Sequence, residues 1–338
     1  MAIDWVERHG AKIDGFFGAY FIGSTVDKRP ESEVEEGSDV DIMVVVDVKD
    51  PGIKLGKFTY CGVLLEVSYV SWDQISDPIK VVESYHLANG LRKDTVIADA
   101  TGALRPLQRT VQQEFPKRGR VLVRSQKIRQ AVVERLSNLD ATATWPDQVT
   151  SWLFATGITT HMVLVAALKN PTVRLRYIAV REVLTQYGFS SWAEQLLGLI
   201  GASHLTQAQV SRHLLLLEHT FDATVRVSKS DFPFSTDITA PARSISIDGL
   251  RVQIQRGFHR EVVFWIVATF ARCHKILAAD APELGLQLLP DFGEVTRQIG
   301  IAPGDKIQQR ARETIHVLPS VWDLTKHIIN INPGIERP

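Results

Sequence analysis

Residues 38–46, with the sequence SDVDIMVVV, constrain the fold of this chain more than any other segment. The apolar, β-branched run from 40 to 46 stands between a Gly-Ser-Asp turn and an Asp-Pro-Gly turn, which indicates a buried strand. Asp39 and Asp41 nevertheless place two carboxylates at the start of this run, although burying an unpaired charge is costly. The segment therefore predicts a sheet in which a buried strand presents acidic side chains at one place.

A third carboxylate is expected beside these two. Residues two apart on a strand point to the same face, about 6.5 to 7 Å apart, so Asp39 and Asp41 share a face. Glu66 lies on the next predicted strand, and pairing across a short polar loop is expected to be antiparallel, which would bring Glu66 beside them. Three such carboxylates repel each other, and Mg²⁺, a hard cation that takes oxygen ligands, would relieve the repulsion.

The pattern of apolar residues divides the chain near residue 116. Short strand signals and turns dominate before this point, whereas long segments with helical periodicity dominate after it. We therefore predict two domains, residues 1–115 with strands and helices and residues 116–338 with mostly helices. Residues 228–249, rich in Ser, Thr, Asp and Pro, are expected to form a long connection within the second domain.

Composition and charge are those of an ordinary globular protein. The chain has 338 residues, 45% of them hydrophobic, and 38 basic residues balance 38 acidic ones, which argues against a nucleic-acid partner. The N-terminal residues lack the pattern of a signal peptide, and no apolar run is long enough to cross a bilayer, so we expect a cytoplasmic protein without a membrane partner. Cys61 and Cys273 lie in apolar contexts and are expected to be reduced, packed thiols.

A glycine turn precedes the acidic strand. At Gly23 a backbone without Cβ can approach a phosphate closely, and the hydroxyl of Ser24 can donate a hydrogen bond to it. A Gly-Ser turn, an Asp-hydrophobic-Asp strand and a later acid together resemble the signature of polymerase-β-type nucleotidyltransferases. The residues that match this signature are Gly23, Ser24, Asp39, Asp41 and Glu66.

A closer resemblance is to the kanamycin nucleotidyltransferase group of aminoglycoside-modifying enzymes. It rests on residues 23–46 and 64–84, and it continues more faintly over the first two thirds of the chain. The resemblance implies an α+β fold, in which a small mixed β-sheet nucleotidyltransferase domain with helices on one face is followed by a mostly α-helical, acceptor-binding domain. A homodimer is compatible with it.

The resemblance also implies an activity. The enzyme would move a nucleoside monophosphate, AMP in the first instance, from ATP or another NTP to a hydroxyl of a small, aminoglycoside-like acceptor and release pyrophosphate. Asp39, Asp41 and Glu66 would hold two Mg²⁺ ions, for which Mn²⁺ can substitute, and Gly23, Ser24 and Ser38 would bind the nucleotide.

Three features depart from the family pattern, and one of them is the segment after about residue 229, which has no counterpart in the family. The family places a general-base glutamate on the first helix of its second domain, where this chain has Asn138, and Glu134 one turn earlier is the replacement that we predict. The loop between Ser24 and Asp39 is long and acidic. Its acid cluster is either a solvated loop or an attractor of a polycationic acceptor, and consists of Glu31, Glu33, Glu35 and Glu36.

A basic stretch follows the predicted domain boundary. It is either ordinary surface charge or a source of one or two contacts to the triphosphate. Its members are Lys117, Arg118, Arg120, Arg124, Lys127 and Arg129.

Two other functions remain open at this level. The acceptor could be a macromolecule, either a tRNA end or a protein hydroxyl, although the balanced charge argues against tRNA. Alternatively, the chain could be a nucleotide-binding regulatory module without turnover, which the absence of the family base favours and the complete acid triad disfavours.

Overall fold

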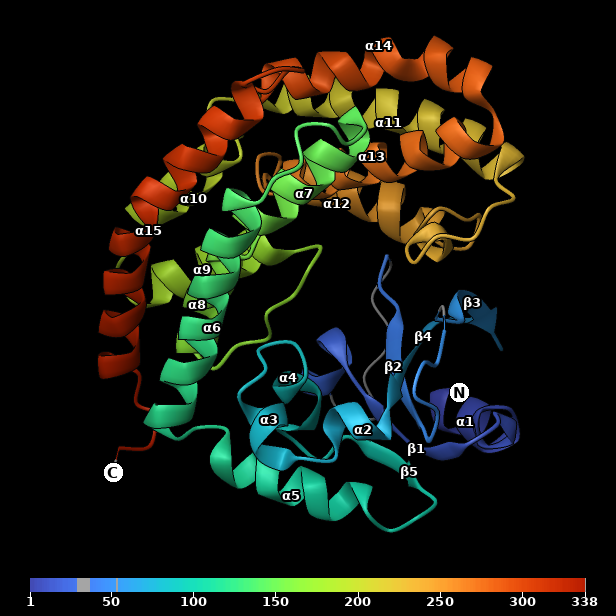
Figure 1. Ribbon diagram of the computed structural model, residues 1–338, viewed down its shortest axis with the longest axis vertical. Coiled ribbons are helices and arrows are strands. Elements are labelled where there is room, and N and C mark those ends of the chain that lie inside the picture. The colour runs from blue at the N-terminus through green and yellow to red at the C-terminus, as the bar shows by residue number, and fades with distance from the viewer. Residues whose placement is uncertain (29–36, 53, 338) are drawn as a thin grey trace.

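The computed structural model describes residues 1–28, 37–52 and 54–337. A five-stranded sheet lies in the N-terminal part, and the chain is mostly helical from Arg118 onward, so the fold is α+β as predicted (Figure 1). We call the part before residue 116 the sheet region and the part after it the helical region. The strands are β1 (Phe16–Phe21), β2 (Val40–Val46), β3 (Gly56–Tyr60), β4 (Val63–Ser71) and β5 (Val96–Asp99).

The sheet is mixed, with the strand order β3-β4-β2-β1-β5. The central strands β2 and β4 pair parallel, whereas the other neighbours pair antiparallel. The predicted antiparallel pairing of β2 with β4 is therefore wrong. The reason is β3, which the sequence analysis missed: this strand takes the antiparallel position beside β4, and the chain then returns in the direction of β2.

A tight turn joins β3 to β4. Both of its central residues, Cys61 and Gly62, have positive φ angles, of 47° and 82°, as a two-residue hairpin requires. Asn or Asp normally precedes the glycine of such a turn, so the sequence Cys-Gly is a weak signal. Cys61 is exposed at this turn and is not the packed thiol that we expected, whereas Cys273 is buried; both are free.

Apolar residues cover both faces of the sheet. On one face, Ile42 and Val44 of β2 share a cluster with Trp5 of α1 (Ala2–Arg8). On the other face, Val45 belongs to a cluster to which four further helices contribute. Helices were expected on one face alone, and this expectation is wrong because α1 covers the opposite face. These four helices are α2 (Trp72–Ile75), α3 (Pro78–Val82), α4 (Ala88–Leu91) and α5 (Leu104–Glu114).

The helical region has one large hydrophobic cluster of its own, with members from Val121 to Ile335. Its helices run along one side of the sheet region and arch over it (Figure 1). Helices α11 to α14 lie opposite the end of β2 that points toward the helical region (Figure 1). They are α6 (Arg118–Ser137), α7 (Trp145–Gly157), α8 (Thr159–Ala166), α9 (Arg176–Gln186), α10 (Ser191–Leu199), α11 (Gln207–Val227), α12 (Gly249–Gln255), α13 (Val263–Asp280), α14 (Pro282–Gln298) and α15 (Lys306–Ile331).

Contrary to the expectation from sequence, the described residues include one stretch that is long and apolar enough to cross a membrane. Residues Trp145–Ala166, in α7 and α8, have a mean hydropathy of 1.4 in their most apolar window. However, 83% of that window is buried inside the protein. Such burial is consistent with a core helix of a soluble protein.

The basic stretch at the start of α6 connects the two regions. Arg124 is buried and donates hydrogen bonds to the carbonyl oxygens of Val82 (2.8 Å) and Phe115 (2.7 Å). Arg120 and Lys127 both form ion pairs with Glu83 of the sheet region. Because these groups satisfy backbone and carboxylate oxygens at the junction, the stretch has a structural role.

Candidate functional site

Strand register aligns three charged residues across the sheet. Asp41 of β2 pairs with Glu66 of β4, and Glu66 pairs in turn with Lys57 of β3. Paired residues point to the same face, so the three side chains form one row. Asp39, just before β2, completes the site: carboxylate oxygens of Asp39, Asp41 and Glu66 all lie within 4.8 Å of one another. Parallel pairing thus brings together the carboxylates that antiparallel pairing was expected to assemble.

The glycine turn packs directly on one of these carboxylates. Gly23 begins the 3₁₀ turn Gly23–Asp27 with a φ angle of 60°, and a Cβ there would lie 2.1 Å from Oδ2 of Asp41. The backbone of Asp41 also binds this turn, because its carbonyl oxygen accepts from Ile22 N (3.0 Å) and its N–H donates to Thr25 Oγ1 (3.2 Å). Glycine is therefore required at residue 23 for the turn and the acidic strand to lie so close.

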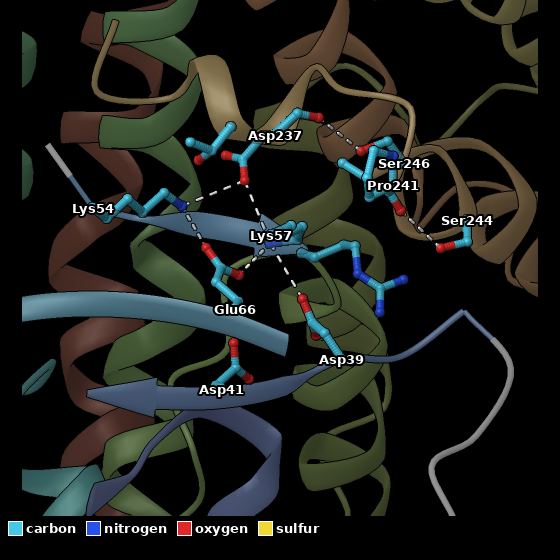
Figure 2. Close-up of polar contacts among 12 residues, drawn as sticks. Asp39, Asp41, Lys54, Lys57, Glu66, Asp237, Pro241, Ser244 and Ser246 are labelled. Carbon is cyan, nitrogen blue, oxygen red and sulfur yellow. Dashed lines mark hydrogen bonds and ion pairs between the residues drawn. The ribbon is translucent and has the colours of Figure 1, made fainter. Parts of the chain in front are cut away.

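Two lysines neutralise the carboxylates. Nζ of Lys57 hydrogen-bonds to Glu66 and lies 3.2 Å from Oδ2 of Asp39, and Lys54 also hydrogen-bonds to Glu66 (Figure 2). The side chain of Lys57 is only 7% exposed. Lys57 was not predicted because β3 was not predicted from the sequence. The alternation of Lys57-Phe58-Thr59-Tyr60 before a glycine was the available signal.

The helical region adds a fourth acid to the site. Asp237, in the connection after α11, lies 3.4 Å from Nζ of both Lys54 and Lys57 (Figure 2). Its other carboxylate oxygen lies 3.1 Å from Nη1 of Arg272 on α13. The neighbouring Thr236 fits against Gly56, where a Cβ would lie 2.2 Å from that of Thr236. Local sequence contains no signal for Asp237, since tertiary packing alone places it here.

A cavity of about 630 Å³ lies between the sheet and the helical region. The predicted nucleotide-binding residues Gly23, Ser24 and Ser38 line it, together with the acid triad. Its charged lining comprises four acids and six cations and so has a net charge of +2. The acids are Asp39, Asp41, Glu66 and Asp237, and the cations are Lys28, Lys54, Lys57, Arg174, Arg256 and Arg272.

The acids respond differently to this environment. Burial, and then repulsion by Asp39 and Glu66, raise the pKa of Asp41 well above its usual value. Burial alone would also raise the pKa of Glu66, but Lys57 and Lys54 lower it to about 2. For Lys57, the nearby carboxylates outweigh the effect of burial and raise its pKa. Asp41 is thus the carboxylate whose charge the described residues compensate least.

The predicted general base lies elsewhere. Glu134 is exposed near the end of α6 and is not among the residues that line the cavity. Asn138 caps the same helix end, where its side-chain amide donates to the carbonyl oxygen of Glu134 (2.9 Å). The role of Glu134 therefore stays a prediction without a geometric basis. The acid cluster at 31–36 lies outside the described residues.

Comparisons of this chain with protein-family models, with curated proteins and with solved structures found no match.

Proposed function

We propose that this protein is a Mg²⁺-dependent nucleotidyltransferase that moves a nucleoside monophosphate, AMP in the first instance, from an NTP to a hydroxyl of a small molecule. The observation that carries the proposal is the carboxylate triad, whose oxygens lie within 4.8 Å of one another, beside a glycine turn and on the wall of a 630 Å³ cavity. The hydroxyl oxygen bonds to the α-phosphorus, the bond to the β-phosphate breaks, pyrophosphate leaves, and the hydroxyl proton passes to water.

The donor set fits a hard divalent cation. Asp39, Asp41 and Glu66 offer only carboxylate oxygens, the ligands that Mg²⁺ and Mn²⁺ prefer. The raised pKa of Asp41 means that its ionised form is disfavoured in the metal-free protein, and a bound cation would remove that cost. Mg²⁺ would neutralise triphosphate charge and make the acceptor hydroxyl more acidic.

Lys54 and Lys57 would each keep an acidic partner if a metal ion bound the triad. Removing one member of a buried ion pair is costly, because the remaining charge loses its partner. Here both Lys54 and Lys57 have Asp237 as a second partner. They can therefore release Asp39 and Glu66 to a cation without becoming unpaired.

The proposal puts the phosphates beside the triad. Gly23, Ser24 and Ser38 line the cavity next to the carboxylates, and Lys28 donates to the hydroxyl of Ser38 at 3.4 Å. Backbone N–H groups, hydroxyls and a nearby lysine are the usual phosphate-binding groups. Their role here is to position the triphosphate, because in phosphoryl transfer positioning and charge stabilisation supply most of the catalysis.

Calorimetric titration with ATP tests the proposal. We expect binding in Mg²⁺ or Mn²⁺ and its loss in EDTA, and the Asp323→Asn variant should behave like the wild type because Asp323 is an exposed surface residue of α15. Full-affinity binding in EDTA would remove the metal-dependent site.

A regulatory nucleotide-binding module is the second candidate. It is favoured by the pairing of Glu66 with two lysines and by the fact that Glu134 is not among the residues that line the cavity. Incubation with labelled ATP and Mg²⁺ separates the candidates, with aminoglycosides, total tRNA or cell lysate as sources of acceptor. Label transfer to any of these supports the transferase, and the labelled fraction distinguishes a small molecule from a macromolecule.

A further inference from the structure

The wall of the cavity that belongs to the helical region differs in charge from the wall that belongs to the sheet region. On the sheet side, the lining contains three lysines and three acids, which balance. On the helical side, three arginines face a single acid, Asp237. We call six of the polar lining residues of this side the helical wall: Arg174, Asp237, Gln253, Arg256, Trp265 and Arg272.

Arg272 is a cation of the helical wall whose side chain is fixed by aromatic and acidic neighbours. Its side chain is only 12% exposed, and its guanidinium lies over the ring of Trp265, 4.7 Å from the centroid, with Phe154 and Phe234 also within 6 Å. Nη1 lies 3.1 Å from Asp237 Oδ2, but it makes no aligned hydrogen bond within the described part of the chain. Arg272 is therefore a rigidly placed guanidinium with unused donor capacity.

Trp265 has an unused donor as well. The residue lines the cavity and is buried, 7% exposed, and its Nε1, which other protein atoms cover, makes no hydrogen bond to any described residue. An indole N–H and a guanidinium can only donate, so a ligand that satisfies both must supply acceptor atoms. A carboxylate or a phosphate supplies two or three such oxygens, and its negative charge is complementary to the positive charge of the arginines.

Charge balance in the loaded site leads to the same conclusion. The charge of two Mg²⁺ ions approximately cancels that of a nucleoside triphosphate, so loading leaves the lining with its own net charge of +2. This sum covers the described residues and leaves out residues 29–36. A polycation would increase the net positive charge of a partly desolvated cavity, whereas an acidic group would reduce it.

We propose that the helical wall is the acceptor subsite and that it binds the acceptor through an acidic group, a carboxylate or a phosphate, with Arg272 and Trp265 as the donors. The inference rests on the proposed nucleotidyltransferase function. It selects an anionic acceptor in place of the polycationic, aminoglycoside-like one that the sequence resemblance implies.

The indole N–H of Trp265 offers a direct probe of this subsite. Its resonance can be assigned in ¹⁵N-labelled protein by comparison with the Trp265→Phe variant. The protein is first loaded with Mg²⁺ and a non-hydrolysable ATP analogue, with loading verified by calorimetry, and is then titrated separately with inorganic phosphate, acetate, glycerol and kanamycin. Failure to load counts against the proposed function, whereas the later titrations test the acceptor subsite alone.

We expect phosphate or acetate to shift the Trp265 resonance saturably, and the stronger of the two identifies the acidic group. Glycerol and kanamycin should leave the resonance unchanged. Arg272→Met keeps the length of the side chain and should weaken anion binding by about tenfold or more, as expected for a lost charge-assisted hydrogen bond. The control Arg212→Met, which removes an exposed arginine paired with Glu294 on the outer surface, should bind like the wild type.

Two results would overturn the inference. One is an Arg272→Met variant that binds phosphate and acetate as tightly as the wild type. The other is a loaded protein whose Trp265 resonance responds to neither phosphate nor acetate.

Discussion

The two walls of the cavity were assembled in different ways. We call the charged lining from the sheet region the sheet wall, which consists of Lys28, Asp39, Asp41, Lys54, Lys57 and Glu66. There, hydrogen-bonded register aligns Asp41, Glu66 and Lys57 across three strands. On the helical wall, Asp237 and Arg272 come from a connection and a helix that only tertiary packing brings to the site. Consequently, sequence pattern alone locates acids on the sheet wall and is silent about the helical wall.

The sheet wall should dominate the chemistry. Asp39→Asn removes one metal ligand while nearly keeping its shape, so turnover should fall by on the order of 10³-fold, equivalent to the several kcal/mol that metal ions contribute to transition-state stabilisation. Steady-state assays of labelled AMP transfer measure this effect, with Asp323→Asn as the matched surface control. If Asp39→Asn kept most of its turnover, the sheet wall would not be the catalytic wall.

Lys57 is the point at which the two walls meet, since it contacts Glu66 and Asp39 on one side and Asp237 on the other. Lys57→Met should destabilise the metal-free protein by about 3 kcal/mol, because buried carboxylates lose their cation. Mg²⁺ should restore part of this loss and should raise the melting temperature of the variant more than that of the wild type.

The control for this comparison is Lys80→Met, since Lys80 is 83% exposed and only loosely paired. The melting temperatures of the wild type, Lys57→Met and Lys80→Met are measured with EDTA and with Mg²⁺. The difference between the two conditions gives the effect of Mg²⁺ on each protein. An equal effect of Mg²⁺ on wild type and Lys57→Met would mean that lysine and metal do not compete for the carboxylates.

The smallest effect is expected at Glu134. Loss of a general base lowers turnover by a factor of about 10² to 10⁴. Glu134 is exposed on α6 and is not among the residues that line the cavity, which favours unchanged turnover in Glu134→Gln. A large fall in turnover with unchanged ATP binding would support the base assignment and would require α6 to approach the cavity during catalysis.

The same contrast explains what could be predicted from sequence. The acid pair at Asp39 and Asp41, the glycine turn at Gly23 and the third acid Glu66 follow from local pattern, and the structure brings all four together. Lys57 was missed because a Cys-Gly hairpin carries a weak turn signal, and with it the parallel pairing of β2 and β4 was missed.

The helical wall lay beyond such reasoning for a physical reason. Asp237 lies in a polar connection whose sequence is typical of a solvated loop, and the fit of Thr236 against Gly56 together with ion pairs to Lys54 and Lys57 holds it at the sheet. Arg272 lies on an apolar helix, where a single arginine would ordinarily be interpreted as surface charge. Sequence also suggested a base on α6, and a helical position carries no information on how the helix packs against a distant sheet.

Asp41→Asn provides the most direct test of the central claim, which is that this strand holds carboxylates for a metal and not for packing. Because the pKa of Asp41 is raised in the folded state, that state binds more protons than the unfolded state between the ordinary pKa of 3.8 and the raised one. Wild-type stability therefore decreases across this interval as pH rises, and the Asn variant avoids that decrease.

The measurement is the melting temperature of wild type and Asp41→Asn in EDTA from about pH 4 to pH 8, followed by Mg²⁺ with ATP at the upper pH. The account predicts that the variant melts at the same temperature as the wild type at low pH and at a higher one as pH rises, while losing the stabilisation by Mg²⁺ and ATP. A marked drop at neutral pH, on the order of the 3 to 5 kcal/mol lost when a buried pair is broken, would contradict it and make Asp41 a structural residue.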